Sequence, residues 1–353
     1  MPLVRTDATE FTGIPTFMRA PSVDIEQVTP GMFAVAGVPY DLSARVPGAR
    51  YGPRAIRTAS SNLFAVPDGL NEGWTDAESA GRLKFRDGSA FALGDLGDFA
   101  VTALDWTTTS REVEHAMHET ASAGAIPLIL GGDHLITLPL ITGFQEAMVK
   151  AGRGRVGYLR FSSKLDLGER DEILGDTWRG ATNRRILERN VVNPSNMVWV
   201  GVGGFVPEPE FELVRSRGMR AHTVGEVRSD GITAVTHRAL LEAGAGCDTV
   251  YVSIDMDVVN GAYLQCQGIP SFRGLHNVEL QEAMNVLSGS AVGALDVVGV
   301  NPLPDFWGQG QVASYFAASL IFYFITTPRD CGRGSFSETF QRRASTTELR
   351  EST

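Results

Sequence analysis

The sequence predicts an α/β fold in which a central, mostly parallel sheet lies between two layers of helices. Short apolar runs rich in Val and Ile recur along the chain, and segments with helical patterns separate them. The apolar runs are continuous rather than alternating, which is typical of strands covered on both faces. The expected strands are Phe33–Val38, Ala125–Leu130, Val156–Phe161, Met197–Val202, Thr249–Ile254 and Ala291–Val298.

Helices are expected between these strands, because parallel strands need crossover connections. They are Pro53–Ser60, Thr109–Ser122, Leu138–Ala151, Phe211–Arg217, Ile232–Leu241 and Val278–Leu287. No shift in composition marks a domain boundary, so one domain is expected over residues 31–328. Residues 1–30 contain Pro and Gly breaks and are predicted to form an N-terminal arm that either wraps a neighbouring subunit or is disordered. The polar residues 329–353 are predicted to form a flexible tail.

The composition excludes several classes of function. Apolar residues make up 43% of the 353 residues, which is enough for a sizeable core, and the net charge of -10 argues against a nucleic-acid or anionic-membrane surface. The three cysteines, Cys247, Cys266 and Cys331, are too few and scattered for a disulfide framework or a zinc site. No apolar run approaches the roughly twenty residues that span a bilayer, and the polar N-terminus lacks the core of a signal peptide. A cytoplasmic protein that binds neither nucleic acid nor membranes is expected.

Polar residues follow four of the predicted strands, where ligands bind in open parallel sheets. The motifs are Gly131–His134, Ser162–Asp166, Asp255–Asp257 and Gly299–Pro302. Each motif alone is common, because Gly-Gly-Asp-His usually forms a tight turn and Asp-x-Asp usually caps a helix or lies in solvent. One His and three Asp residues at neighbouring strand ends together indicate a site for hard divalent cations.

In these motifs and their order the chain resembles the ureohydrolases, the family of arginase and agmatinase. The resemblance implies a three-layer, arginase-like α/β/α fold and assembly into trimers or hexamers. It also implies two divalent ions, manganese or nickel, whose bridging hydroxide attacks the carbon of a guanidinium group. The segments that carry it are Phe11–Arg19, Gly37–Asp41, Pro47–Arg57, Gly94–Asp98, Gly131–His134, Ser253–Asp257 and Asp296–Pro302.

The resemblance further implies six metal ligands, and two of them are replaced in this chain. Ser162 stands where the family has an Asp that bridges both ions, and Lys164 stands where it has a His. A lysine ammonium has no lone pair to donate and repels a cation, so Lys164 is expected to neutralise the remaining acids in place of a metal ion. The four ligand positions that keep their residue types are His134, Asp166, Asp255 and Asp257.

Other positions also depart from the family. Gly299 replaces the Glu that holds the substrate's guanidinium group, and Arg179 replaces a His. The family's Asp-Pro becomes Asn260-Gly261, and its Gly-x-Arg-Gly becomes Gly201–Gly204. We therefore expect no catalytic residue and no bound metal in this chain; the six ligand positions are interpreted as vestigial, and the substrate-binding residues are unknown.

The chain is accordingly predicted to be a catalytically inactive subunit that supports an active, nickel- or manganese-dependent paralogue in a hetero-oligomer. It resembles the inactive subunit of heteromeric bacterial ureohydrolases whose complex cleaves a biguanide, converting metformin to guanylurea and dimethylamine. Two alternatives stay open. One is an active enzyme with a mononuclear metal site at His134, Asp166 and Asp255; the other is an anion-binding protein that uses Lys164 and Arg179.

Overall fold

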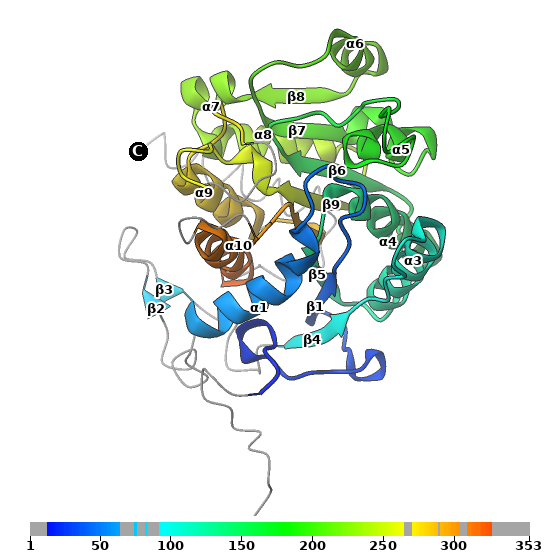
Figure 1. Cartoon of the computed structure of the whole chain (residues 1–353), viewed down its shortest axis with the longest axis vertical. Coiled ribbons are helices and arrows are strands. Elements are labelled where there is room, and N and C mark those ends of the chain that lie inside the picture. The colour runs from blue at the N-terminus through cyan, green and yellow to red at the C-terminus, as the bar shows by residue number, and fades with distance from the viewer. Residues whose placement is uncertain are drawn as a thin grey trace, which may run out of the picture.

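A parallel eight-stranded sheet forms the centre of the computed structural model, which describes residues 13–63, 74–75, 82–83, 92–264, 270–288, 290–303 and 309–326. The strand order is β4-β1-β5-β10-β9-β6-β7-β8, and every pair of neighbours is parallel (Figure 1). The strands are β1 (Phe33–Val38), β4 (Leu93–Asp98), β5 (Ile126–Gly131), β6 (Val156–Phe161), β7 (Met197–Val202), β8 (Arg220–Thr223), β9 (Thr249–Asp255) and β10 (Val292–Val298). The two-residue strands β2 (Trp74–Thr75) and β3 (Arg82–Leu83) form a separate antiparallel pair.

All six predicted strands are present, and β1, β6 and β7 have the predicted bounds. Strands β4 and β8 were not predicted from the sequence. Strand β4 reads Leu-Gly-Asp-Leu-Gly-Asp and β8 reads Arg-Ala-His-Thr, so neither has a continuous apolar run. Both are the edge strands of the sheet, where one side needs no neighbouring strand and polar residues are tolerated.

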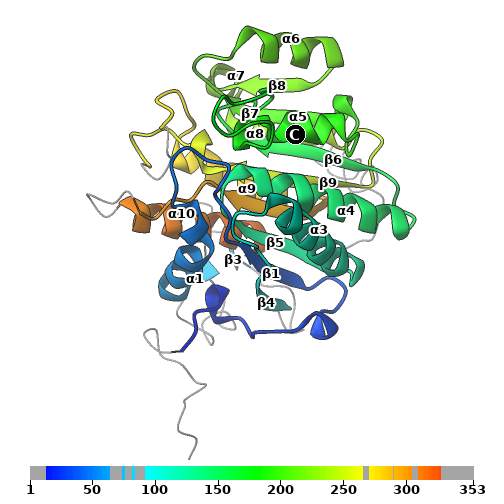
Figure 2. The same cartoon turned by 45° about the vertical axis from the view of Figure 1, so that its right-hand side comes forward.

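Helices cover both faces of the sheet (Figures 1 and 2). One layer holds α1 (Gly52–Leu63), α7 (Val224–Asp230), α8 (Ile232–Ala243), α9 (Asn277–Ser288) and α10 (Gln309–Thr326). The other holds α3 (Trp106–Ser122), α4 (Thr137–Lys150), α5 (Thr182–Glu188) and α6 (Glu208–Arg217). All six predicted helices are present, whereas α5, α7 and α10 were not assigned from the sequence.

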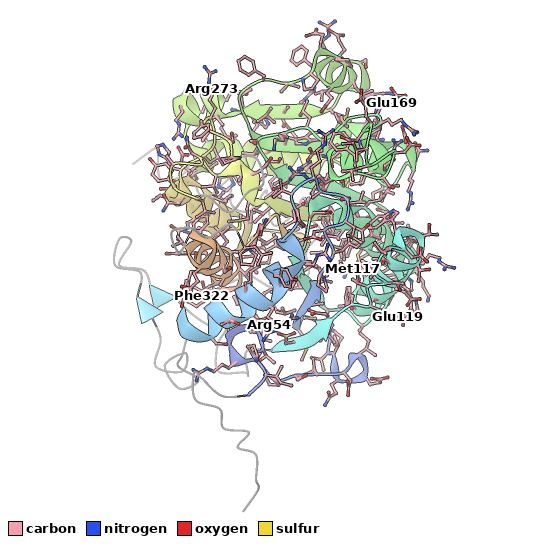
Figure 3. The ribbon with its side chains drawn as sticks, in the orientation of Figure 1. Arg54, Met117, Glu119, Glu169, Arg273 and Phe322 are labelled. Atoms are coloured by element: carbon pink, nitrogen blue, oxygen red, sulfur yellow. The ribbon has the colours of Figure 1, made fainter. Side chains whose placement is uncertain are left out.

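Two apolar clusters fill the space between the sheet and its helix layers. Phe322 of α10 belongs to one cluster and Met117 of α3 to the other, and they lie on opposite sides of the molecule (Figure 3). Helix α10 is apolar around most of its circumference because it packs against both α1 and α9. None of the helices in the described ranges has both the length and the apolar character needed to cross a bilayer.

Residues 13–30, the described part of the predicted N-terminal arm, lie against the core of the same chain. Phe17 is fully buried, and its backbone N–H donates to Asp95 Oδ2 at 2.7 Å. The Met18 N–H donates to Ser60 Oγ of α1 at 2.8 Å. Residues 1–12, the predicted tail 329–353, Cys266 and Cys331 lie outside the described residues, and Cys247 is a free thiol.

Candidate functional site

The candidate site lies at the carboxyl ends of β5, β6 and β9, and its first side chain comes from the turn after β5. In this turn a Cβ at Gly132 would lie 1.8 Å from the Tyr40 carbonyl oxygen, so only glycine permits the close approach. Asp133 accepts hydrogen bonds from the Leu135 N–H at 3.0 Å and from Ser43 Oγ at 2.7 Å. Burial raises the pKa of Asp133 to about 6. These contacts hold the turn so that His134, 1% exposed, faces the site.

The end of β9 and the 3-10 turn Met256–Val258 that follows it supply two buried carboxylates, Asp255 and Asp257. Asp255 Oδ1 accepts the Asp257 N–H at 3.0 Å, which caps the short turn that follows the strand. Asp257 Oδ1 accepts from Ser162 Oγ at 2.8 Å, and Oδ2 accepts from Ser163 Oγ at 3.1 Å. Both oxygens of Asp257 are therefore bonded to protein hydroxyls.

Strand β6 supplies the fully buried Arg160, a side chain of the site that was not predicted from the sequence. Its Nη2 donates to Asp166 Oδ2 and, at 3.2 Å, to Asp255 Oδ2. Burial opposes the charge of Arg160, but Asp166 and Asp255 outweigh it and raise the pKa of the guanidinium above its ordinary value. A permanent positive charge therefore lies between the two carboxylates.

Lys164 has a narrower role than expected. Its Nζ lies 3.4 Å from Asp257 Oδ2, and its side chain is 38% exposed. The expectation that Lys164 neutralises Asp255 and Asp166 as well is therefore corrected, since Arg160 makes both of those contacts. A signal was present in the sequence: an arginine inside a strand expected to be covered on both faces must find a buried partner.

The protonation states of His134 and Asp255 follow from burial and from the charges beside them. The pKa of His134 is lowered well below its ordinary value by burial and by the nearby charge of Arg160, so the imidazole is neutral. The pKa of Asp255 is raised to about 7 by burial and by the charge of Asp257, with Arg160 acting in the opposite direction. His134 Nδ1 lies 3.5 Å from Asp166 Oδ2 and has no hydrogen-bond partner among the described residues.

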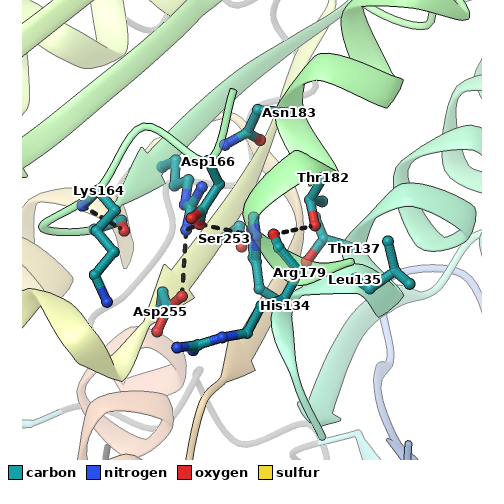
Figure 4. Close-up of polar contacts among 12 residues, drawn as sticks. His134, Leu135, Thr137, Lys164, Asp166, Arg179, Thr182, Asn183, Ser253 and Asp255 are labelled. Atoms are coloured by element: carbon teal, nitrogen blue, oxygen red, sulfur yellow. Dashed lines mark hydrogen bonds and ion pairs between the residues drawn. The ribbon is translucent and has the colours of Figure 1, made fainter. Parts of the chain in front are cut away.

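The backbone around Asp166 is held in place by hydrogen bonds that involve Asn183 and Tyr158. Asp166 has φ 48°, a left-handed conformation that Asp adopts more readily than most residues. The Asn183 N–H donates to the Asp166 carbonyl oxygen at 3.1 Å, and Asn183 Nδ2 donates to the Leu165 carbonyl oxygen at 2.6 Å. Tyr158 Oη donates to Asn183 Oδ1 at 3.1 Å. Figure 4 shows the carboxylate of Asp166 facing Asp255 and His134.

All six ligand positions that the resemblance implied thus come together, but their present side chains do not fit a pair of metal ions. Donor atoms of His134, Asp166 and Asp255 lie within 4.8 Å of one another, a spacing compatible with one divalent cation. The Arg160 guanidinium is hydrogen-bonded to two of these three residues, and its charge opposes a cation in that place. At the second position, Asp257 is bonded to hydroxyls and lies beside an ammonium group.

A small cavity of about 20 Å³ borders the site. It has room for about one water molecule, whereas sites for small organic ligands measure about 300 Å³ or more. Gly299 has φ 80°, and a Cβ there would lie 2.7 Å from Asp255 Oδ1. Arg179 extends from the start of the 3-10 turn before α5 toward Asp255 (Figure 4). The lining residues are Ala44, Val46, Ala49, Asp133, Arg179, Asp255, Asp257, Gly299 and Asn301.

Residues 32–326 match the model of the Arginase family, and the chain therefore belongs to that family. It is 32% identical to the guanidinopropionase of Pseudomonas aeruginosa over 330 residues, which cover 92% of this chain and 94% of that protein. It is 29% identical to a human mitochondrial guanidino acid hydrolase over 89% of this chain and 82% of that protein.

Solved structures agree with the fold. The structure of proclavaminate amidino hydrolase from Streptomyces clavuligerus has a TM-score of 0.73 at 25% identity, covering 91% of this chain and all of that one. The formimidoylglutamase of Bacillus subtilis has a TM-score of 0.76 at 21% identity, covering 93% and 98%. The predicted α/β fold and the resemblance to the ureohydrolase family are confirmed.

Proposed function

We propose that this chain is a catalytically inactive member of the arginase family that supports an active paralogue in a hetero-oligomeric, cytoplasmic hydrolase. The observation that carries the proposal is the state of Asp257, whose two carboxylate oxygens are bonded to Ser162 and Ser163 and lie beside Lys164. These contacts take the place of a second metal ion and its ligands.

The chemistry of the family explains why this matters. A pair of metal ions lowers the pKa of the bridging water and polarises the group under attack, so both effects weaken together when one ion cannot bind. The site also has little capacity to bind a substrate, because Gly299 has no carboxylate to hold a guanidinium group and the cavity has a volume of only about 20 Å³. Hydrolysis at this site is therefore not expected.

The proposed complex hydrolyses C–N bonds of guanidines or biguanides, with nickel or manganese bound in the active partner. Support for the guanidine class comes from the relatives, since two of them are named guanidinopropionase and guanidino acid hydrolase. Metformin is the substrate to test first, because the chain resembles the inactive subunit of metformin hydrolase. Water would replace the dimethylamino group, giving guanylurea and dimethylamine.

The experiment is to express the chain alone and together with an active ureohydrolase encoded beside it. Release of urea and of dimethylamine would be measured with nickel and manganese, using metformin, guanidinopropionate and agmatine as substrates. Native mass spectrometry and elemental analysis would give the composition and the metal content of the assembly. We expect the isolated chain to be inert and metal to be present only in proportion to the partner; turnover by the isolated chain would contradict the proposal.

Restoring two ligands provides a sharper test. The double variant Ser162→Asp, Lys164→His should gain some metal affinity but no measurable turnover, because Gly299 still lacks a carboxylate and Arg160 remains in place. Full activity from these two changes alone would refute the account.

A mononuclear enzyme is the second candidate, favoured by the 4.8 Å cluster of His134, Asp166 and Asp255. It requires about one equivalent of metal in the isolated wild-type chain together with hydrolysis of a guanidine compound. The anion-binding hypothesis has less support, because three carboxylates (Asp133, Asp255 and Asp257) line the same cavity as Arg179.

A further inference from the structure

We propose that Arg160 is a tethered replacement for a metal ion, and that its removal opens a site for one divalent cation among His134, Asp166 and Asp255. The inference deepens the proposed function, on which it rests, by naming the group that makes this chain independent of metal. It also assigns to Arg160 the structural role that the sequence had suggested for Lys164.

The charge of Arg160 lies among side chains that could bind a metal ion. Arg160 Nη2 is hydrogen-bonded to one oxygen of Asp166 and to one oxygen of Asp255. Oxygen atoms of these carboxylates and a nitrogen of His134 lie within 4.8 Å of one another, as the ligands of a single ion would. A cationic nitrogen is thus bonded to two members of a set that is compatible with a metal.

The neighbouring strands hold Arg160 in place. Arg160 lies in β6, between Ser253 of β9 and Trp199 of β7 in the registers of the neighbouring strands. A residue fixed on both sides by a sheet has little freedom to move, and its side chain is fully buried. Lys164 differs, since it follows the end of the strand and is 38% exposed. Arg160 is therefore the permanent occupant of the site.

Among the described residues, the guanidinium of Arg160 does not use its full hydrogen-bonding capacity. Arg160 Nε has no partner among the described residues, and Nη1 reaches only the Leu165 carbonyl oxygen at 3.5 Å. A guanidinium offers five N–H donors, and here one nitrogen makes both ion pairs. The buried Nδ1 of His134, 3.5 Å from Asp166 Oδ2, also lacks a hydrogen-bond partner among the described residues. An imidazole nitrogen in that position is suited to donate its lone pair to a cation.

Charge explains why removing Arg160 should create a binding site. Without its guanidinium, the buried Asp255 and the mostly buried Asp166, whose side chain is 11% exposed, lose their main countercharge, which is unfavourable in a low-dielectric environment. A divalent ion bound by two carboxylates and a neutral imidazole would neutralise the site and fill space that the arginine had occupied. Such a mixed set of nitrogen and oxygen donors is suited to nickel or manganese.

The test uses the full-length chain and the variant Arg160→Ala. Metal content after desalting and calorimetric titration with NiCl₂ and MnCl₂ would be measured for both proteins. We expect less than about 0.1 equivalents in the wild type and about one equivalent in the variant, with at least a roughly tenfold gain in affinity. The variant's Tm should fall by about 2–8 °C. Nickel should restore the Tm of the variant but leave the wild type unchanged, and millimolar guanidinium chloride should partly restore the variant.

Two controls separate a created site from nonspecific effects. Arg57→Ala removes another buried arginine that bridges two aspartates and should gain no metal. The double variant Arg160→Ala, Asp255→Asn should lose the metal that the single variant gains. A folded Arg160→Ala protein without metal affinity would overturn the proposal, as would equal binding by the wild type.

If Arg160→Ala does not fold, its refolding is tested with nickel, manganese and guanidinium. Recovery with these cations supports the proposal, and no recovery with any of them overturns it. None of these measurements depends on hydrolysis, so the result stands apart from the fate of the proposed heteromeric enzyme.

Discussion

Two buried arginines of this protein each bridge two aspartates, and they differ in how completely they are bonded. Arg57 of α1 uses all three of its guanidinium nitrogens: Nε donates to Asp95 at 2.9 Å, Nη1 to Asp98 at 2.6 Å, and Nη2 to Asp95 at 3.0 Å and to the Gly97 carbonyl oxygen at 2.7 Å. Arg160 of β6 makes both of its ion pairs through Nη2 alone.

The difference separates Arg57, an arginine that stabilises the fold, from Arg160, which we propose replaces a metal ion. The bidentate contact of Arg57 with Asp95 also fixes the N-terminal segment, because Asp95 accepts the Phe17 N–H. At Arg160, Nε has no hydrogen-bond partner among the residues that the structure describes, and the pKa of Asp255 is raised to about 7. Burial and charge pairing are common to both centres. The number of satisfied donors distinguishes them.

The largest loss of stability is expected for Arg57→Ala, and it should exceed the loss for Arg160→Ala. Loss of Arg57 leaves Asp95 buried without its bidentate partner and should lower the free energy of unfolding by about 3–5 kcal/mol. Loss of Arg160 should cost about 2 kcal/mol, because fewer hydrogen bonds are lost and Asp255 can take up a proton near neutral pH. Urea denaturation at pH 7 measures both. The comparison fails if Arg160→Ala is the more destabilised variant.

The next effect concerns Gly299, at the position where the resemblance to the ureohydrolases implied a Glu. Gly299→Glu should destabilise the protein by about 2–3 kcal/mol, because the residue would be held at φ 80° with its Cβ 2.7 Å from Asp255 Oδ1. Gly204→Glu is the matched control: Gly204 has φ 76°, but no atom of the described part of the chain lies within 4 Å of its added Cβ. We expect the control to cost about 1 kcal/mol in thermal or urea denaturation. Equal losses would show that backbone strain alone matters at Gly299.

The free energy of unfolding should depend on pH through Asp296, a buried acid that is bonded to hydroxyl groups instead of an arginine. Asp296 accepts hydrogen bonds from the hydroxyls of Thr137, Tyr251 and Ser253 at 2.6–2.9 Å, and burial raises its pKa to about 6. Because the pKa of Asp296 is raised in the folded state, protonated Asp296 makes its full contribution to stability below the unfolded pKa. This contribution is lost as the pH rises through about 6.

The wild type should therefore lose about 1 kcal/mol relative to Asp296→Asn between pH 5 and pH 7. Parallel urea titrations of both proteins measure the difference. A constant difference across this range would contradict the assignment of a raised pKa to Asp296.

The smallest effect is expected at Lys164. Lys164→Met should change the free energy of unfolding by less than about 1 kcal/mol, because the ammonium is partly exposed and Asp257 keeps its bonds to Ser162 and Ser163. The variant should also gain no metal. A loss as large as that of Arg160→Ala would return the main countercharge to Lys164.

The sequence predicted the buried strands and the positions of the ligand motifs, because both depend on local pattern. It did not reveal edge strand β4, whose Gly and Asp residues carry no apolar signal, or helix α10, which lacks a polar face. It also missed the role of Arg160. Which cation a carboxylate contacts depends on side-chain direction and on approaches between distant segments; Arg160 and Asp255 are 95 residues apart. Motif matching placed Lys164 in the site, but the chain beyond the strand leaves that side chain partly in solvent.

The order of the strands has a consequence for biosynthesis. Strands β9 and β10 lie at the centre of the sheet although they are the last of the eight to leave the ribosome. Until then β4-β1-β5 and β6-β7-β8 can exist only as two half-sheets, each with an open inner edge that can pair with other chains. Arg160 lies in β6, the inner edge strand of one half-sheet, and its partner Asp255 is translated later, at the end of β9. A nascent chain shorter than about 260 residues therefore contains a guanidinium that can pair with Asp166 but not yet with Asp255, beside strand backbone that has no hydrogen-bond partners, and chaperones should engage it before the sheet closes.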